Sequence, residues 1–212
     1  HQLDKWENEN MPKVKIEGSV ISFSEVYYCV PVTRSFWVEN TGQVVAHFRF
    51  IPKLQDKIVS KPWLSVRPAY GMIPPNEKLE VKLQVHVNTE SAQKLMNGTD
   101  TLDETLILRI ENGRDYFVII SGQYQPSCFG TSLEELVHQV KPVRIAEAQA
   151  ESGVDEPDSP QKIPKELWRI VDDIFHCGGL TQSGIWRAEN AVDNIYELQE
   201  ALDTGAPFPS HR

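Results

Sequence analysis

The residue with the clearest capacity for chemistry is Arg187, which lies in GLTQSGIWRAEN, residues 179–190, on a tight loop between two stretches typical of helices. An arginine presented on a loop can neutralise the charge that develops on a transferred phosphate, and such an arginine finger accelerates hydrolysis by on the order of 10³ to 10⁵. The simpler alternative is a loop arginine surrounded by solvent. The loop itself leaves both interpretations open.

The three cysteines, Cys29, Cys128 and Cys177, lie far apart in the sequence. None belongs to a C-x-x-C pair and no histidine lies at metal-ligand spacing from one, so the sequence indicates neither a zinc site nor a disulfide framework. We therefore expect no metal and no cofactor, and a reducing, cytosolic environment.

Composition limits the classes of partner. The chain has 212 residues, of which 40% are hydrophobic, and 21 Lys and Arg against 30 Asp and Glu give a formal charge of −9. Nucleic-acid binders need a broad cationic surface to neutralise phosphates, so this balance argues against a nucleic-acid partner. No apolar run approaches the roughly 18 residues that suggest a membrane span. The length allows one sizeable core and a smaller appendage.

Residues 13–126 alternate between apolar and polar positions with a period of two. The clearest run is EKLEVKLQVHV, residues 77–87, where apolar residues occupy the odd positions from 79 to 87 and polar residues the even positions from 80 to 86. Similar runs are SVISFSEVYY, RSFWVEN, AHFRFI, WLSVRP, TLILRIE and DYFVIIS. Seven short strands separated by turn sequences, with no helix between them, predict a mainly β protein built on an immunoglobulin-like β-sandwich.

Helical and irregular segments flank the sandwich. Residues 1–12 are polar, with Leu3 and Trp6 three positions apart and Pro12 as a stop, which is typical of the end of a helix. Residues 127–140 predict a short helix with a capping box between Ser132 and Glu135. Residues 141–162 are small and acidic and predict a flexible linker, because too few apolar groups are present to offset the entropy of ordering.

Two helices are expected within residues 163–212. PKELWRIVDDIFHCGG begins at Pro164 and ends at a glycine pair, and NAVDNIYELQEALDTG runs from a cap at Asn190 to a stop at Gly205. Each helix has one apolar stripe, formed by Leu167, Val171 and Ile174 in the first and by Val192, Ile195, Leu198 and Leu202 in the second. Two such helices need further partners, so this short all-α segment is predicted to be incomplete.

Several segments of the predicted sandwich carry a family resemblance. FWVENTGQVVAHFRFIPK, KPWLSVRP, GMIPPNEKLEVKLQV and GRDYFVIISGQYQPSCFGTSLEEL resemble the ASH domain, a relative of major-sperm-protein domains, of the type II inositol polyphosphate 5-phosphatase family, to which the Lowe-syndrome phosphatase belongs. FIPKLQDKIVSKPWL and DYFVIISGQYQPSCFGTSLE are the most specific strings, and the resemblance covers residues 1 to about 140. IPKELWRIVDDIF resembles the first helix of the RhoGAP-like domain that follows in this family.

The resemblance implies a division of the chain. Residues 1–12 would be a connector helix from a phosphatase domain upstream of His1, residues 13–126 the ASH sandwich, residues 127–140 a short helix, residues 141–162 an acidic linker, and residues 163–212 the start of the RhoGAP-like domain. The catalytic residues of the phosphatase are then absent, so we expect this fragment to be no enzyme. The parent is expected to be a phosphatidylinositol 4,5-bisphosphate 5-phosphatase.

The ASH domain of this family binds GTP-loaded Rab GTPases, and the resemblance implies the same here. On this map, Phe117 is the aromatic anchor on the edge strand that carries DYF, Tyr116 and Gly113 are its neighbours, and Trp6 and Leu3 are contacts on the connector helix. A strand edge offers unpaired backbone groups and an aromatic side chain supplies a buried anchor. The implied function is recruitment of a cytoplasmic phosphatase to the surface of endosomal and Golgi membranes. The alternation alone allows Phe117 to face the core, and Trp6 to pack on the missing domain.

The resemblance also bears on Arg187. The finger loop of active RhoGAP domains reads roughly Gly-Ile-Phe/Tyr-Arg-x-Ser-Gly, and Gly184, Ile185 and Arg187 match it, whereas Trp186 replaces the usual aromatic residue and Glu189-Asn190 replaces Ser-Gly. Vertebrate members of the 5-phosphatase family usually lack this arginine, so the sequence departs toward active GTPase-activating proteins. Glu189, however, places a negative charge beside a group that has to meet phosphate. Activation of Rho-type GTPases by Arg187 is kept as the alternative function.

Two further peptide sites are considered. Trp168 lies off the stripe of its helix, near Phe175, and is predicted to be exposed. In the family this tryptophan contributes to a groove for the Phe-and-His motif of endocytic adaptors, so Trp168 and Phe175 are the implied groove; packing on later helices is the alternative. Like major-sperm-protein domains, the sandwich is also a candidate for binding acidic peptides, through Lys53, Lys57 and Lys61, although solvated loop lysines are the simpler explanation.

Overall fold

The computed structural model describes residues 11–144, 161–181, 183 and 195–209. The chain divides into two compact units, His1–Gln125 and Pro126–Arg212. Each unit is described by itself, since their relative placement is not determined.

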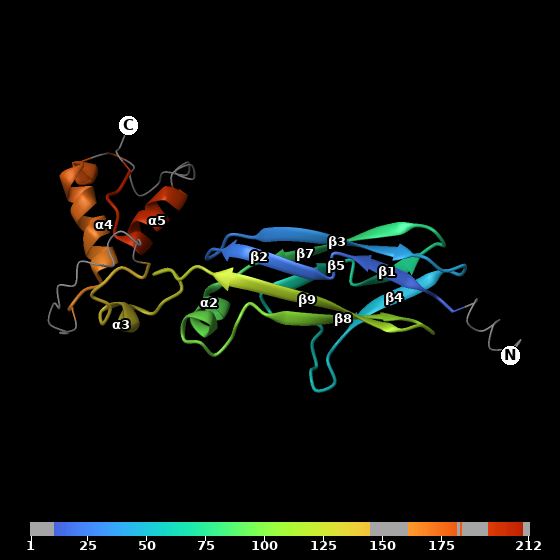
Figure 1. Cartoon of the computed structure of the whole chain (residues 1–212). Helices are drawn as coiled ribbons and strands as arrows, with labels where there is room; N and C mark the ends of the chain where they lie inside the picture. The colour runs from blue at the N-terminus through green and yellow to red at the C-terminus, as the bar shows by residue number, and fades with distance from the viewer. Residues whose placement is uncertain (1–10, 145–160, 182, 184–194, 210–212) are drawn as a thin grey trace, which may run out of the picture. The chain divides into compact units, whose positions relative to one another are not determined.

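The first unit is a sandwich of two β-sheets (Figure 1). The four-stranded sheet has the order β1 (Val14–Glu17), β3 (Val32–Asn40), β7 (Lys78–Val85) and β5 (Leu64–Arg67), with antiparallel neighbours throughout. The five-stranded sheet has the order β2 (Val20–Val26), β9 (Asp115–Tyr124), β8 (Glu104–Ile110), β4 (Ala46–Ile51) and β6 (Tyr70–Ile73), in which β2 runs parallel to β9. The predicted immunoglobulin-like sandwich is confirmed.

Alternation within the strands builds the core between the sheets. In β7, Val81, Leu83 and Val85 are fully buried, whereas Lys82 and Gln84 are exposed, as the sequence pattern predicts. Burying each such aliphatic or aromatic side chain contributes about 1.5–3 kcal/mol. The largest fully buried side chains come from strands of both sheets and from the loop before β5: Trp63, Phe23, Phe36, Ile73, Leu83, Leu106, Leu108, Ile110 and Ile120.

The seven predicted strands all form, but the described residues contain two more strands and a helix. The missed strands, β1 and β6, have four residues each. The expectation that no helix interrupts the sandwich is wrong, because α2 (Thr89–Met96) lies between β7 and β8. Asn88 caps α2 by accepting a hydrogen bond from the backbone N–H of Ser91 at 2.9 Å, and Lys94 pairs with Glu90 one turn away at 2.7 Å.

The chain changes sheets at Gly18, and this change determines where β9 is covered. Gly18 adopts a φ of 83°, so β1 pairs with β3 in one sheet while β2 pairs with β9 in the other. The pairing of β2 begins where the N–H of Ile119 donates to the carbonyl oxygen of Ser19 at 2.8 Å, with Val20 opposite Ile119. Among the described residues, no strand pairs with residues 115–118 of β9 on the side away from β8.

The second unit contains the helices α3 (Leu133–Leu136), α4 (Lys165–His176) and α5 (Ile195–Thr204) and a 3₁₀ turn, η2 (Gly179–Thr181). The predicted capping box between Ser132 and Glu135 is present at the start of α3. A small core joins these elements through Cys128, Leu136, Leu202, Phe129, Val143, Ile170 and Phe208. No helix in the described segments is long and apolar enough to cross a bilayer.

A buried carboxylate ties α5 to the segment before α3. Asp203 is 3% exposed and accepts hydrogen bonds from the backbone N–H of Cys128 at 2.7 Å, the hydroxyl of Ser127 at 3.1 Å and the guanidinium of Arg144 at 3.0 Å. The apolar stripe predicted for α4 is not its buried face, because Leu167 and Val171 are both exposed. Asn190 and Val192 of the second predicted helix lie outside the described residues.

A substitution at Gly18 tests the change of sheet. A Cβ atom at this position would lie 3.7 Å from the Cβ of Phe36, an ordinary contact, so the cost of Gly18→Ala comes from the left-handed backbone. We expect Gly18→Ala to lower the free energy of unfolding by about 1–2 kcal/mol and Gly18→Asn to lower it less, because asparagine tolerates positive φ. Urea unfolding of both variants measures this, and an unchanged stability of Gly18→Ala would contradict the assigned backbone.

Candidate functional site

The start of β9 presents apolar side chains to solvent. Phe117 is 57% exposed and Ile119 is 49% exposed, whereas Val118 and Ile120 between and after them are buried. The strand is apolar on both faces, and the structure places Phe117 on the outer one. Phe117 is therefore not part of the core. The alternative that the sequence pattern left open, in which Phe117 faces the core, is wrong.

The backbone at Phe117 faces the same open side. In a β-strand, alternate residues point their N–H and C=O groups to the same edge. The N–H of Ile119 points to β2, where it donates to Ser19, so the N–H and C=O of Phe117 point in that direction too, where β2 has not yet begun. β9 is thus an interior strand along most of its length, and the predicted edge is limited to residues 115–118, which we call the open end of β9.

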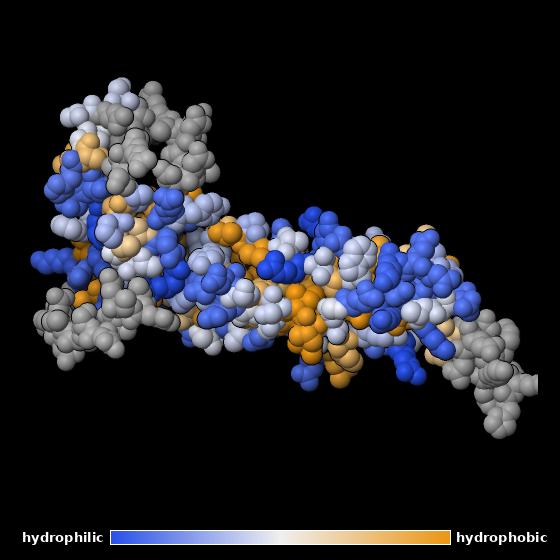
Figure 2. Space-filling view, turned by 45° about the horizontal axis from the view of Figure 1, so that its top comes forward, coloured by the Kyte–Doolittle hydropathy of each residue, from blue (hydrophilic) through white to orange (hydrophobic). Residues whose placement is uncertain are grey.

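An apolar stripe continues from the open end across the outer face of the five-stranded sheet. Val20 is 67% exposed and lies opposite Ile119, Ile107 lies opposite Phe117, and Ile51 lies opposite Ile107. Opposite residues of paired strands share one face of a sheet. Figure 2 shows apolar side chains gathered over the middle of the sandwich. Apolar side chains that gather on one face in this way are typical of a protein interface.

Tyr116 and Gly113 support the open end rather than forming its contact surface. Tyr116 is partly buried against the core, and its hydroxyl accepts a hydrogen bond from the N–H of Val14 at 3.4 Å. A Cβ atom at Gly113 would lie 2.9 Å from Cγ2 of Ile110 and 3.1 Å from the carbonyl oxygen of Pro12, so only glycine fits there without a shift. The structure brings Gly113, Tyr116 and Phe117 together, whereas the two predicted connector contacts, Leu3 and Trp6, lie outside the described residues.

A hollow of about 300 Å³ lies beside the open end, lined by residues 11–14, Thr41, Arg114 and Tyr116. The side chains of Lys13 and Arg114 are exposed at this hollow. Sequence reasoning missed both. Arg114 directly precedes the DYF string, which is the signal that would have found it, whereas Lys13 and Thr41 reach the hollow only through tertiary contacts.

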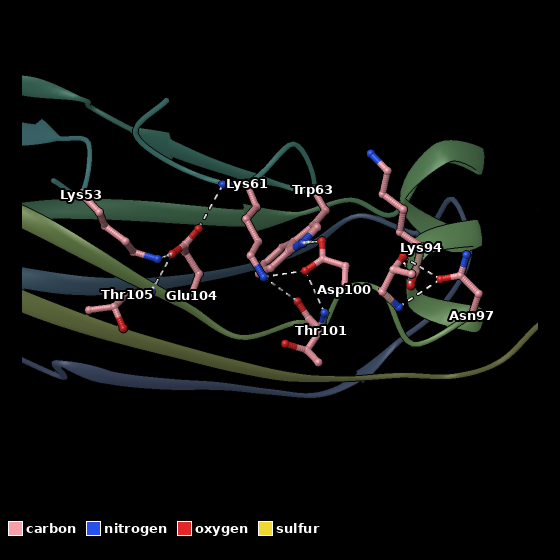
Figure 3. Close-up of polar contacts among 10 residues, drawn as sticks. Lys53, Lys61, Trp63, Lys94, Asn97, Asp100, Thr101, Glu104 and Thr105 are labelled. Atoms are coloured by element: carbon pink, nitrogen blue, oxygen red, sulfur yellow. Dashed lines mark hydrogen bonds and ion pairs between the residues drawn. The ribbon is translucent and has the colours of Figure 1, made fainter. Parts of the chain in front are cut away.

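The lysines considered for acidic peptides are largely paired within the sandwich (Figure 3). Lys61 binds the carboxylate of Asp100 at 2.5 Å, and Lys53 pairs with Glu104. Glu104 is buried and also accepts hydrogen bonds from the backbone N–H groups of Lys61 at 3.2 Å and Thr105 at 2.8 Å. Two of the three lysines therefore have their charge balanced internally, which leaves little positive charge for an acidic peptide.

The predicted exposure of Trp168 is confirmed on α4. Trp168 is 59% exposed and Phe175 is 62% exposed, and Leu167 and Val171 extend the same apolar surface. Trp168 lines two hollows, one of about 330 Å³ with Arg169, Asp172, Asp173, His176 and Phe208, and one of about 350 Å³ with Gln161, Lys162, Ile163 and Lys165. Phe175 lines neither hollow. Arg187 and its loop partners at residues 184–186 lie outside the described residues.

Comparison with known proteins adds a family to this geometry. Residues 16–124 match the family model described as inositol polyphosphate 5-phosphatase OCRL-like, ASH domain. The chain is 33% identical over 214 residues to the type II inositol 1,4,5-trisphosphate 5-phosphatase of Mus musculus, which covers 96% of this chain and 21% of that protein. It is 24% identical over 172 residues to the Rho GTPase-activating protein gacA of Dictyostelium discoideum, which covers 81% of this chain and 42% of that protein.

The chain thus spans about a fifth and about two fifths of the lengths of these two relatives. Among solved structures, it is similar to the ASH / PapD-like domain of human CEP192, with a TM-score of 0.39 and 11% identity over 54% of this chain and 87% of that one. It is also similar to WR4, a C. elegans MSP family member, with a TM-score of 0.36 and 8% identity over 53% of this chain and 97% of that one.

Acid titration tests the pairing of Lys61 with Asp100. Partial burial opposes ionisation of Asp100, but the hydrogen bonds from Lys61 and from the backbone of Thr101 hold the pKa of Asp100 below its usual value. Because the folded-state pKa lies below the unfolded one, ionised Asp100 stabilises the fold above about pH 3.9, and this contribution is lost as pH falls through the folded pKa.

We expect Asp100→Asn to lower the free energy of unfolding by about 1–3 kcal/mol at neutral pH and to flatten its decrease in acid. Urea unfolding at a series of pH values measures both effects. Asp56→Asn, which changes an exposed carboxylate in the β4–β5 loop that carries Lys61, is the matched control and should keep the wild-type stability at neutral pH. Equal stability of the two variants there would show that the ion pair has no structural role.

Proposed function

This chain belongs to the OCRL-like inositol polyphosphate 5-phosphatase ASH-domain family, and from this premise we propose that it binds a GTP-loaded Rab GTPase through the open end of β9. It is the ASH region of an inositol polyphosphate 5-phosphatase homologue. Its role in this proposal is non-catalytic: the GTPase holds the phosphatase at the membrane on which its lipid substrate lies.

The observation that carries the proposal is that the exposed Phe117 lies on a backbone edge with which no other strand in the described part of the chain pairs. An extended segment of a partner can hydrogen-bond to the N–H and C=O of Phe117 and bury the Phe117 ring in the same contact. Aromatic residues in such positions are frequent hot spots, and their truncation typically costs about 2 kcal/mol or more. Val20 and Ile119 give the partner further apolar surface that is already exposed in the free protein, and the half-buried Ile107 lies opposite Phe117 on the same face.

GTP-loaded Rab proteins on endosomal and Golgi membranes recruit the parent protein from the cytoplasm, and the phosphatase then removes the 5-phosphate of phosphatidylinositol 4,5-bisphosphate there. The exposed surface of α4 around Trp168 and Phe175 is assigned to the Phe-and-His motif of endocytic adaptors, since a short amphipathic helix can dock its apolar face on such a surface.

The test is the affinity of residues 1–212 for a panel of Rab GTPases, each in GTP-loaded and GDP-loaded form. We expect binding to the GTP-loaded form of at least one member, and a loss of about 30-fold or more in Phe117→Ala, which corresponds to about 2 kcal/mol. Tyr70→Ala is the matched control, because Tyr70 is an exposed aromatic residue on β6 at the other edge of the same sheet. If Phe117→Ala and Tyr70→Ala lose affinity equally, or if Phe117→Ala binds as tightly as the unsubstituted chain, the site is not at the open end of β9.

A second candidate function is acceleration of GTP hydrolysis by a Rho-type GTPase. It is supported by the similarity to a protein named as a Rho GTPase-activating protein and by the match of Gly184, Ile185 and Arg187 to a finger loop. We expect the unsubstituted chain to accelerate GTP hydrolysis and both Arg187→Ala and Arg187→Lys to lose this activity. The reason is that the finger has to place a planar, always charged guanidinium on the phosphate. Hydrolysis rates that the parent chain leaves unchanged across a panel of Rho-type GTPases would reject this candidate.

A further inference from the structure

We propose that the hollow beside the open end of β9 receives a carboxylate side chain of the bound GTPase, held between Lys13 and Arg114. We call it the basic hollow. The inference rests on the proposed function, because it assigns a second, electrostatic contact to the same docking site. The partner then has to carry an acidic side chain next to the surface that buries Phe117.

The walls of the basic hollow are fixed before any partner arrives. The carbonyl oxygen of Lys13 accepts hydrogen bonds from the N–H groups of Thr41 at 2.9 Å and Gly42 at 3.2 Å. The N–H of Val14 donates to the hydroxyl of Tyr116, and Gly113 lets the β8–β9 turn approach the carbonyl oxygen of Pro12. The backbone that carries Lys13 is thereby held against the turn that carries Arg114, and a preformed site loses less entropy on binding.

The two cations of the hollow differ from their neighbours in having no counter-charge among the described residues. Lys78 pairs with Glu17 at 3.0 Å, Lys15 lies 3.8 Å from the same carboxylate, and Arg109 pairs with Asp115 at 2.7 Å. Within the described part of the chain, the side chains of Lys13 and Arg114 make no ion pair or hydrogen bond, although the whole chain has a formal charge of −9. The positive charge that the described residues leave unpaired at this hollow is available to a partner.

A protein carboxylate fits this site better than the other common anion, a phosphorylated lipid headgroup. Arginine offers a planar pair of donors and lysine a point charge, and together they can saturate the two oxygens of one carboxylate. A phosphate monoester carries about −1.5 to −2 charges at neutral pH, so a bisphosphate needs more cations than these two. A hollow of about 300 Å³ has room for one acidic side chain from a partner already held at Phe117.

The experiment compares two charge-matched double variants in binding to the GTP-loaded Rab that binds the parent chain most tightly. Lys13→Glu/Arg114→Glu reverses the charge of the hollow, and Arg34→Glu/Lys57→Glu makes the same change of net charge at exposed positions elsewhere in the sandwich. We expect the first to lower the affinity by about tenfold or more, chiefly through a slower association rate with a weaker salt dependence, and the second to change it by less than about threefold.

Two additions keep the result interpretable. Arg114→Ala, a milder change, is expected to lower affinity by about three- to tenfold, which protects the test against misfolding of the reversed variant. Single Asp→Lys and Glu→Lys changes on the face of the GTPase that binds the sandwich should include one that restores binding to Lys13→Glu/Arg114→Glu, and a double-mutant cycle then identifies the paired residue.

The failures of the two proposals differ. Weak binding by Phe117→Ala together with parent-like affinity of Lys13→Glu/Arg114→Glu overturns the basic hollow and leaves the proposed function standing. Absence of GTPase binding by the parent chain overturns both. Binding to phosphatidylinositol 4,5-bisphosphate vesicles that the reversal abolishes, with GTPase affinity unchanged, overturns the carboxylate assignment in favour of a lipid headgroup.

Discussion

The change of sheet at Gly18 is the constraint from which the candidate site follows. Because residues 14–17 pair with β3 and residues 20–26 with β9, the first strand region of the chain contributes to both layers of the sandwich. This closes one side of the sandwich, but it means that β2 covers β9 only from Ile119 onward. Among the described residues, the backbone at Phe117 is therefore left unpaired on this side because the chain changes sheet at Gly18. The exposure of the Phe117 ring has a different origin, the alternation of β9, which also places Ile119 on the outer face.

Sequence reasoning recovered the parts of the fold in which one face of an element is buried and the other is not. The alternation in β7 is unambiguous for this reason, and so the sandwich was predictable. β1 and β6, with four residues each, are too short for a periodic signal. The helix α2 follows the alternating run of β7 closely, so its N-cap at Asn88 was not recognised as the start of a helix. In β9 the string DYFVIIS is apolar on both faces, so the alternation of apolar and polar residues does not predict whether Phe117 faces the core or the solvent.

What the sequence could not supply are contacts between distant positions. Lys53 and Glu104 are 51 residues apart, and Lys61 and Asp100 are 39 apart, yet these pairs decide that the lysine-rich loop is internally balanced. The basic hollow depends in the same way on Lys13 and Arg114, which meet only because β1 is held to Tyr116. In the second unit, the sequence predicted an exposed Trp168 correctly, and the structure adds that Leu167 and Val171 share its exposure.

The central claim is that a partner strand pairs with the open end of β9, and hydrogen exchange at single amides tests it most directly. The N–H of Phe117 has no acceptor among the described residues, so it should exchange fast in the free chain and slow by about tenfold or more when a GTP-loaded Rab is bound. Amides of β6, residues 70–73, at the opposite edge of the same sheet should be unaffected. Slowed exchange at β6 with none at Phe117 would place the partner on the other edge and contradict the account.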